Sequence, residues 1–302
     1  MVIKKNRKFK ILSLDSGGVR GILENTLLLR LSKKYPTLIE DMDMIIGTSI
    51  GNIISLSLAY GLTPEKIQHI LKNHGKTIFS CKNINPFKPL FSNRNFMDLI
   101  NDTFPEDLQL VDLHKIVATT TVQVSGSIDS IKPLIYSNAP LSPNKHALVR
   151  DVALSGGTVP AFFPICNNQI DGAVVAGNPS LVGICVASSQ LNIPLNNISM
   201  LSLGTGFNPT ILPDDANNWG PTQWIINRQM GLPLLDVFSL GQSALESRLS
   251  SMLLKSRYHR LDIPLDKDVS FNDYKSINYL IDKANKYDLS DTFRWINRIW
   301  CS

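Results

Sequence analysis

Ser49 stands at the centre of a short glycine-flanked sequence, GTSIG, at residues 47–51. Apolar segments precede and follow it, so a strand, a sharp turn and a helix are expected in that order. Such a turn pushes a serine hydroxyl away from the backbone, and the start of the helix directs N–H groups toward negative charge that develops beside it. The pattern predicts a serine nucleophile for acyl transfer. A tight turn with a purely structural role is the competing interpretation, because GxSxG alone is a weak signal.

A serine nucleophile needs a base within hydrogen-bond reach. Of the five histidines, only His259 follows a plausible acid in the order Ser, Asp, His. Its surroundings at residues 257–262 (RYHRLD) alternate like a strand whose polar residues face water. Ser49 also follows fewer strands than the nucleophile of an α/β-hydrolase. We therefore predict that His259 is a strand residue, exposed or locally paired, rather than the base.

A carboxylate is the alternative base. Asp171 precedes Gly172 and stands at a long stretch, residues 172–213, that has no charged residue. A charge isolated in apolar surroundings is costly, so such an aspartate is usually paired or functional. Gly172 lets the backbone bend there, although an ordinary Asp-Gly turn has the same sequence.

A third sequence, DSGGVRG at residues 15–21, directly follows a predicted strand and opens a helix. The N–H groups of Gly17 and Gly18 at a helix start would form an anion site, for a phosphate or for the oxyanion of an acyl-transfer intermediate. Ser16 occupies the place of the first glycine of a dinucleotide-binding loop, and no acidic residue in a clear second βα unit follows. The loop also lacks the Gly-Lys-Ser/Thr ending of a Walker loop.

The elements around these sequences place all three at strand ends. We predict strands at residues 9–14, 44–46, 115–124, 198–203 and 258–263, helices at 22–34 and 50–60, and an irregular helical segment at 64–104 that could cap the site. Strands that alternate with helices and end in glycine-rich turns imply an α/β fold with a largely parallel sheet wrapped by helices. No repeat or linker interrupts the chain. We therefore expect one domain over residues 1–302, with a motif-bearing core at about 8–265 and a helical C-terminal segment at 266–302.

The composition is that of a globular chain. Hydrophobic residues make up 43% and charged residues 18%, and the net charge of +5 is scattered, so no nucleic-acid partner is expected. A modest positive charge would still suit an anionic membrane surface. The cysteines lack metal-ligand spacing and no signal peptide is visible, which favours a cytoplasmic protein. Uncharged stretches at 44–62 and 172–213 are interrupted by turn-forming residues and are typical of a buried sheet centre.

In this order, the three sequences resemble those of the patatin-like phospholipase family, which has a DGGGxxG loop, a GxSxG turn and a DG(A/G) motif. Three further segments are similar to family motifs: VPAFFP at 159–164 to the APTYFP-type segment, GNP at 177–179 to NNP, and LSLGTG at 201–206 to the SLGTG strand end. The resemblance covers roughly residues 8–265. The ordered combination is far more specific than any one motif.

The resemblance implies a three-layer patatin-like fold and a Ser–Asp dyad. Ser49 would attack a fatty-acyl ester of a membrane phospholipid while Asp171 takes its proton. The N–H groups of Gly17 and Gly18 would form the oxyanion hole, with Arg20 nearby to favour negative charge. The other glycines of the family motifs are Gly21, Gly47, Gly51 and Gly172.

The resemblance also implies a phospholipase A-type activity that is independent of calcium and needs no metal or cofactor. A lipid aggregate would be the partner, with peripheral membrane contact and no obligatory protein partner.

Three departures from the family pattern bear on substrate fit and rate. Ser16 replaces a glycine, and would cost about 1–2 kcal/mol if that position needs a positive φ. Asn52 replaces the glycine that often follows GxSxG, and residues 155–158 (SGGT) replace a more alanine-rich stretch. None of these changes removes a catalytic atom.

Three alternatives stay open at this point: an α/β-hydrolase-type esterase with a Ser49–Asp171–His259 triad, an acyltransferase that uses the same dyad, and a non-enzymatic lipid-binding protein. The C-terminal run at residues 288–300 has two interpretations. Its tryptophans and arginines would suit a bilayer interface, but a docked closing helix is favoured because aromatic stripes usually face a core.

Overall fold

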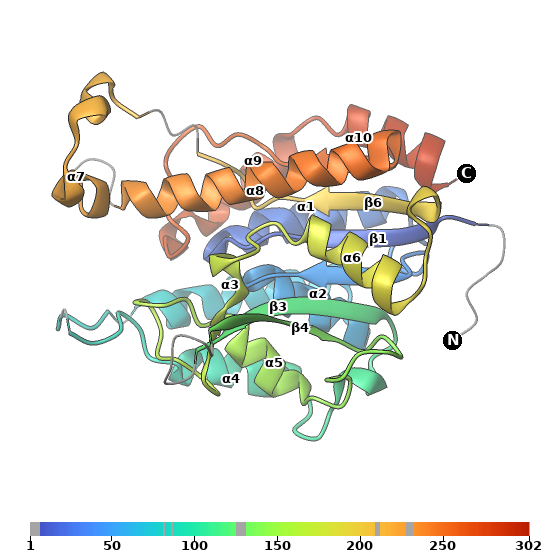
Figure 1. Ribbon diagram of the computed structural model, residues 1–302, viewed down its shortest axis with the longest axis horizontal. Helices are drawn as coiled ribbons and strands as arrows, with labels where there is room; N and C mark the ends of the chain where they lie inside the picture. Colours follow the sequence, from blue (N-terminus) through green and yellow to red (C-terminus); the bar gives the residue numbers. More distant parts are fainter. Residues whose placement is uncertain are drawn as a thin grey trace.

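The computed structural model describes residues 7–80, 82–85, 87–124, 131–208, 212–227 and 232–301. Within these ranges the chain forms a seven-stranded sheet wrapped by helices (Figure 1). The strands are β1 (Phe9–Leu14), β2 (Met44–Gly47), β3 (Ile116–Gln123), β4 (Lys132–Ser137), β5 (Gln169–Asp171), β6 (Ile198–Leu203) and β7 (Tyr258–Leu261). Their order is β4-β3-β2-β1-β6-β7, and β5 pairs with β3. The pairs among β3, β2, β1, β6 and β7 are parallel, which confirms the largely parallel sheet.

Two of the strands were not predicted from the sequence. Both β4 and β5 pair antiparallel with β3. The first is a half-exposed edge strand that contains Pro133, and the second has only three residues. Neither has a hydrophobic pattern long enough to predict a strand.

Helices cover both faces of the sheet and give three layers. They are α1 (Gly21–Lys34), α2 (Ile50–Tyr60), α3 (Pro64–Ser80), α4 (Arg94–Thr103), α5 (Val149–Ser155), α6 (Ser180–Gln190), α7 (Pro221–Ile225), α8 (Pro233–Leu254), α9 (Ile277–Lys286) and α10 (Ser290–Trp295) in the described ranges. In β1, Leu12 and Leu14 pack with α1, α3 and α9, whereas Phe9 and Ile11 pack with α6 on the other face. Alternate side chains of a strand point to opposite faces, so a continuous apolar run marks a strand that is covered on both sides.

The C-terminal segment closes one face of the sheet. A π-helical turn, Ile296–Trp300, continues α10, and the side chains of Trp295 and Trp300 are 5% and 0% exposed. Both belong to the hydrophobic cluster around α1. The docked closing helix is therefore confirmed. No helix in the described ranges is long and apolar enough to cross a membrane.

The carboxyl ends of the parallel strands gather the predicted motifs at one edge of the sheet. The glycine loop follows β1 and Ser49 follows β2, and these strands are neighbours. β1 has β2 on one side and β6 on the other, while α1 and α6 lie on opposite faces. The chain leaves β1 and its neighbour β6 toward opposite faces of the sheet, which makes this position a topological switch point. Open α/β sheets bind their ligands at such points.

Candidate active site

Ser49 sits on a strained turn between β2 and α2. Its φ is 57° and its ψ −120°, an uncommon conformation for a residue other than glycine, with a cost of about 1–3 kcal/mol. Close packing of the backbone fixes the turn. A Cβ atom on Gly47 would lie 2.0 Å from the Gly51 carbonyl oxygen, and one on Gly51 would lie 2.4 Å from that of Leu14. Only glycine fits at these positions, which explains both glycines of the GxSxG sequence.

Asp171 lies at the end of β5 and faces this turn. Pairing with Thr121 of β3 sets the register of Asp171, whose N–H also donates to the Thr158 carbonyl oxygen at 3.1 Å. The Ser49 Oγ donates a hydrogen bond of 2.6 Å to Asp171 Oδ2. Gly172 follows directly and packs so closely on the Thr120 carbonyl that a Cβ atom would lie 2.2 Å from its oxygen. The structure thus brings together two residues that are 122 positions apart in the sequence.

Burial controls the charge of Asp171. The residue is 0% exposed, and Ser49 is 6% exposed. Burial raises the pKa of Asp171 to about 7, although hydrogen bonds from Ser49 and from the Ala173 N–H partly offset this effect. A carboxyl group with a pKa near neutrality can both accept and return a proton at physiological pH.

The glycine loop brings Gly18 to the cavity that Ser49 lines. Gly18 has a φ of 56° and lines the same cavity as Ser49. The Val19 N–H donates to the Phe271 carbonyl oxygen at 2.7 Å and so fixes the loop. Within the described residues, the N–H groups of Gly17 and Gly18 have no acceptor. Ser16 does not adopt a positive φ, so the strain considered for it does not arise.

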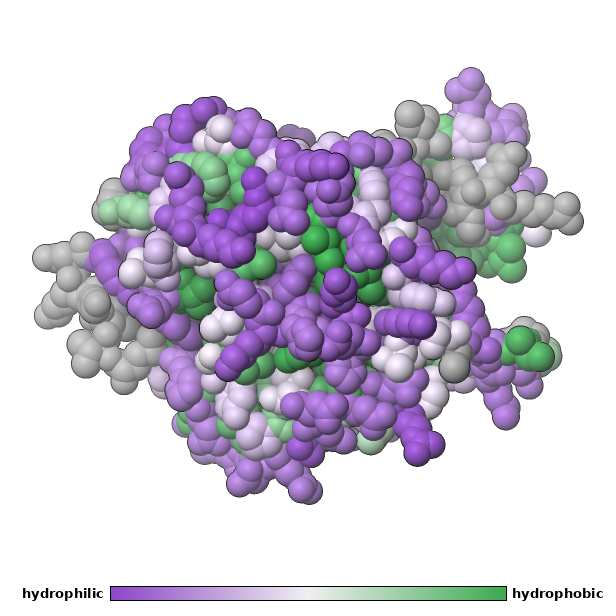
Figure 2. All heavy atoms as spheres, turned by 180° about the vertical axis from the view of Figure 1, so that it is seen from behind, coloured by the Kyte–Doolittle hydropathy of each residue, from purple (hydrophilic) through white to green (hydrophobic). Residues whose placement is uncertain are grey.

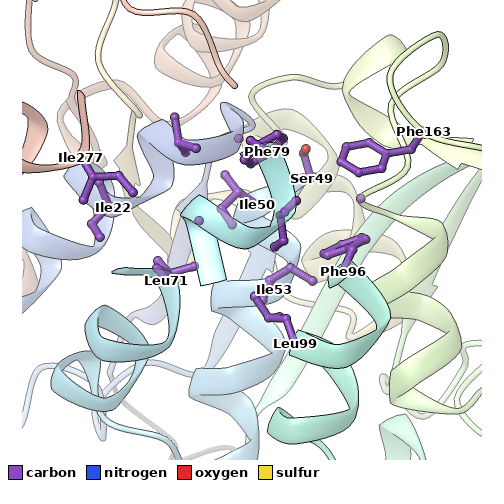
Figure 3. Close-up of a pocket in the computed structure, with 15 residues that line it drawn as sticks. Ile22, Ser49, Ile50, Ile53, Leu71, Phe79, Phe96, Leu99, Phe163 and Ile277 are labelled. Carbon is purple, nitrogen blue, oxygen red and sulfur yellow. The ribbon is translucent and has the colours of Figure 1, made fainter. Parts of the chain in front are cut away.

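A cavity of about 60 Å³ opens at Ser49 and is almost entirely apolar (Figure 3). Its lining comes from the glycine loop, α1 to α4, α9 and the segment around Phe163. Ser49 is the one polar side chain of this lining. Figure 3 shows its hydroxyl flanked by the rings of Phe79 and Phe163. The cavity suits an unbranched hydrocarbon chain more than a polar group.

The family model for patatin-like phospholipases matches residues 12–183. The Bacillus subtilis protein CotR, which is named as a sporulation hydrolase, is 32% identical over 320 residues and covers 98% of this chain and 99% of CotR. The chain belongs to the patatin-like phospholipase family. Family members are in general lipid acyl hydrolases, and membership therefore supports a hydrolase.

Other patatin-like proteins match over different lengths. The protein teg of Priestia megaterium is 32% identical and covers 97% of this chain and 99% of its own length. Patatin-2-Kuras 3 of Solanum tuberosum is 28% identical over 265 residues, which cover 72% of this chain and 66% of that patatin. Among solved structures, VipD from Legionella pneumophila matches 92% of this chain and 67% of its own, at 12% identity and a TM-score of 0.43.

Arg20 lies apart from the cavity in this patatin-like site. It is not one of the lining residues, and its Nε atom is buried without a partner in the described structure. Burial lowers its pKa, while Asp262 and Asp268 are among the acids that act in the opposite direction. Gly21, the first residue of α1, packs instead against α2, where a Cβ atom would lie 2.4 Å from Ile50 Cγ1.

An ion pair that the sequence did not reveal holds the first residue of the glycine loop. Arg260 on β7 donates to both carboxylate oxygens of Asp15, at 2.8 and 2.5 Å, and also bonds Asp262 at 2.8 Å. The expectation that the polar residues of β7 face water is wrong for Arg260, whose side chain is only 18% exposed. The signal available in the sequence was Asp15 itself, a charge directly after a buried strand that needs a partner.

His259 does not reach Ser49. Its Nε2 atom lies 2.9 Å from the Thr292 Oγ1, and its ring stacks on Trp295 at a centroid distance of 5.2 Å. β7 is three strands from β2, a separation of about 14 Å. The prediction of a locally paired strand residue is confirmed, and this geometry argues against the triad. Within the described chain, no group of three or more His, Cys, Asp or Glu residues could hold a metal ion.

Proposed function

We propose that this protein is a phospholipase A-type lipid acyl hydrolase whose catalytic groups are Ser49 and Asp171. The observation that carries the proposal is the 2.6 Å hydrogen bond between them, with Ser49 in the lining of an apolar cavity. A serine paired with a buried carboxylate has both a nucleophile and a base, and the cavity gives the acyl chain of a lipid a place next to the nucleophile.

The first half of the reaction forms an acyl-enzyme. Asp171 Oδ2 accepts the hydroxyl proton while Ser49 Oγ attacks the ester carbonyl carbon. The N–H groups of Gly17 and Gly18 face the oxyanion of the tetrahedral intermediate, where their uncommitted donors stabilise negative charge. The C–O bond to the glycerol oxygen then breaks. That oxygen takes the proton from Asp171 and leaves as the alcohol of a lysolipid.

The second half releases the fatty acid. Asp171 takes a proton from a water molecule, whose oxygen attacks the acyl carbonyl, and the bond to Ser49 Oγ breaks as the proton returns to it. The pKa of Asp171 near 7 suits both directions of transfer, because a much stronger acid would not accept the serine proton.

The rest of the proposal concerns conditions and setting. We propose that the reaction needs no calcium, metal or cofactor, because the chemistry described above uses only side chains and backbone donors of the chain. Membrane phospholipid is the proposed substrate, in a cytoplasmic protein with peripheral membrane contact and no obligatory protein or nucleic-acid partner. Arg20 contributes to this scheme only through its positive charge behind the loop, and residues 1–302 act as one catalytic domain.

Fatty-acid release from mixed phospholipid vesicles, with a calcium chelator present, tests the proposal. Wild type is compared with Ser49→Ala and Asp171→Asn, which should each abolish release. Ser55→Ala is the matched control, since this buried serine of α2 bonds only the Asn52 carbonyl oxygen in the described structure. Loss of activity on chelation would refute the metal-free part of the scheme.

Product analysis separates hydrolysis from acyl transfer. With an added alcohol such as a lysophospholipid, an acyltransferase would form an acylated product instead of free fatty acid. The absence of both products with every lipid and soluble ester would refute the enzymatic proposal and favour a lipid-binding protein.

A further inference from the structure

The beginning of α8 is apolar and uncovered. All of residues 234–241 (LLDVFSLG) are exposed, with Leu235 at 47% and Phe238 at 67%, and Asp236 is the one charged residue among them. Near its other end the same helix packs on the sheet through the buried Ser250 and Leu254, although Met252 and Leu253 are exposed there too. A helix in water normally hides an apolar stripe against a core. We name residues 234–241 the α8 tip; an exposed apolar segment of this kind marks a contact surface.

A second apolar projection lies in the loop between α3 and α4. Ile84 is 97% exposed and Phe87 is 95% exposed; we name this pair the loop tip. The base of the loop is firmly held beside the cavity, because the Phe91 N–H donates to the Phe162 carbonyl oxygen at 2.7 Å. The Phe91 ring also packs on that of Phe163, a cavity residue, at 5.6 Å.

Both tips lie at the edge of the sheet that holds Ser49. α3 ends at this edge, because Phe79 in its last turn lines the cavity. α8 follows the carboxyl end of β6 and returns to the start of β7, so its first turns lie at the same edge. In Figure 1 the α3–α4 loop and the start of α8 project from the same end of the molecule. In Figure 2, seen from behind, apolar atoms are visible on the projecting α3–α4 loop at the lower right.

The charge around the loop tip complements an anionic surface. Residues 66–97 contain six basic residues and no Asp or Glu, and the six side chains are all exposed: Lys66, Lys72, Lys76, Lys82, Lys88 and Arg94. Two of them, Lys82 and Lys88, flank the loop tip directly. Basic side chains next to exposed apolar ones are typical of protein segments that insert into the interface of an anionic bilayer.

We infer that the α8 tip and the loop tip together dock this protein on an anionic phospholipid bilayer. The apolar side chains enter the acyl-chain boundary, the lysines contact the headgroups, and the edge of the sheet that holds Ser49 then faces the lipid. The inference rests on the lipid substrate of the proposed function, but docking itself requires no catalysis and is measured without it.

Cosedimentation with vesicles tests the inference in the inactive Ser49→Ala protein. Vesicles of phosphatidylcholine with phosphatidylglycerol are compared with vesicles of phosphatidylcholine alone. The tip variant carries Ile84→Ser, Phe87→Ser, Leu235→Ser and Phe238→Ser, and its affinity for the anionic vesicles should fall at least about tenfold. Lys82→Gln with Lys88→Gln should weaken binding to anionic vesicles by about fivefold per lysine, and should leave binding to neutral vesicles unchanged.

The matched control removes exposed leucines from the opposite edge of the sheet. Leu141 is 64% exposed and follows β4, and Leu195 is 40% exposed and precedes β6. Leu141→Ser with Leu195→Ser should bind anionic vesicles like the parent. All the replaced side chains are exposed, so the variants should fold, and circular dichroism verifies this.

Two results would overturn the docking surface: a tip variant that binds anionic vesicles as tightly as the control, or a dimer in sedimentation that the tip variant dissociates without any change in vesicle binding. The latter would assign the surface to a second copy of the chain. In the active protein, the tip variant should keep hydrolysis of a soluble short-chain ester and lose that of vesicle lipid. If the proposed function is wrong, the wild type should bind vesicles but hydrolyse no ester. This result differs from a loss of vesicle binding, so the two failures are distinguishable.

Discussion

Two buried aspartates lie at the carboxyl edge of the sheet, and they differ in what faces them. Asp15 follows β1 and is 5% exposed, and Asp171 ends β5 and is 0% exposed. Burial raises the pKa of both, to about 6 for Asp15 and to about 7 for Asp171. Arg260 offsets part of this effect at Asp15 through a two-pronged ion pair. Asp171 instead accepts hydrogen bonds from a serine hydroxyl and a backbone N–H, and no cation among the described residues acts on its pKa.

The comparison shows how a partner changes the role of a buried carboxylate. An ion pair with fixed geometry keeps Asp15 in place and anchors the glycine loop next to β7. A buried carboxylate that faces a serine hydroxyl instead of a cation keeps a raised pKa, so its oxygen is a stronger base toward that hydroxyl. The following predictions test this difference, beginning with the largest effect.

Asp171→Asn should reduce kcat for vesicle phospholipid by about 10²–10⁴-fold, because an amide cannot accept the Ser49 proton. Asp15→Asn is the comparison, and its kcat per folded molecule should fall far less. Steady-state fatty-acid release from equal amounts of folded protein measures both. An equal loss in the two variants would remove the distinction between base and anchor.

The stability of Asp171→Asn relative to wild type should depend on pH. The folded pKa of about 7 exceeds the ordinary value of 3.8, so the folded state binds the proton more tightly. Wild type therefore loses stability as pH rises from about 4 to about 7, and the neutral amide does not. The variant should gain up to about 4 kcal/mol relative to wild type across this range. Urea unfolding at pH 4 and pH 8 measures the gain, and a constant difference would contradict the raised pKa.

Asp15→Asn should lower the free energy of unfolding at pH 8 by about 1–2 kcal/mol, because Arg260 loses its bidentate partner and keeps only the ion pair with Asp262. Arg260→Met should lower it similarly by leaving Asp15 unpaired. Asp41→Asn, which changes a half-exposed carboxylate at the other end of the sheet, is the control and should stay within about 0.5 kcal/mol. Full stability of Asp15→Asn would show that the pair does not anchor the loop.

The pH profile of kcat/KM for a soluble ester should rise with pH and level off above about 7. Asp171 must be ionised to accept a proton, so activity should fall about tenfold per pH unit below its pKa. Using a soluble ester removes the titration of vesicle headgroups from the profile. A midpoint near 4 would mean that Asp171 is solvated in the free enzyme.

His259→Ala should change kcat/KM by less than about twofold and should lower stability by about 1 kcal/mol, through the lost Trp295 stacking and Thr292 hydrogen bond. Thr292→Val should show a similar, smaller effect. Loss of activity in a folded His259→Ala protein would return the triad to consideration.

The sequence alone determined the parts of this protein that depend on local chain geometry. The largely apolar segment FKILSL predicted β1 correctly at residues 9–14, and α2 begins and ends where predicted. The GxSxG spacing marked the Ser49 turn, in which Gly47 is required by the carbonyl of Gly51 four residues further on, whereas Gly51 is required by the close approach of Leu14 on the neighbouring strand. The order of three motifs was enough to indicate the family.

Which distant segments and side chains pack against these local elements depends on the tertiary structure alone. β5 is three residues long and forms only because β3 pairs with it, and that pairing places Asp171 against Ser49. Arg260 is paired with Asp15 because β7 joins the sheet beside β6, 245 residues further along the chain than Asp15. Hydrophobic periodicity reports which face of a segment is covered, but it carries no information about which distant segment covers it. The partner of each buried charge, and with it the pKa, therefore depends on the assembled sheet.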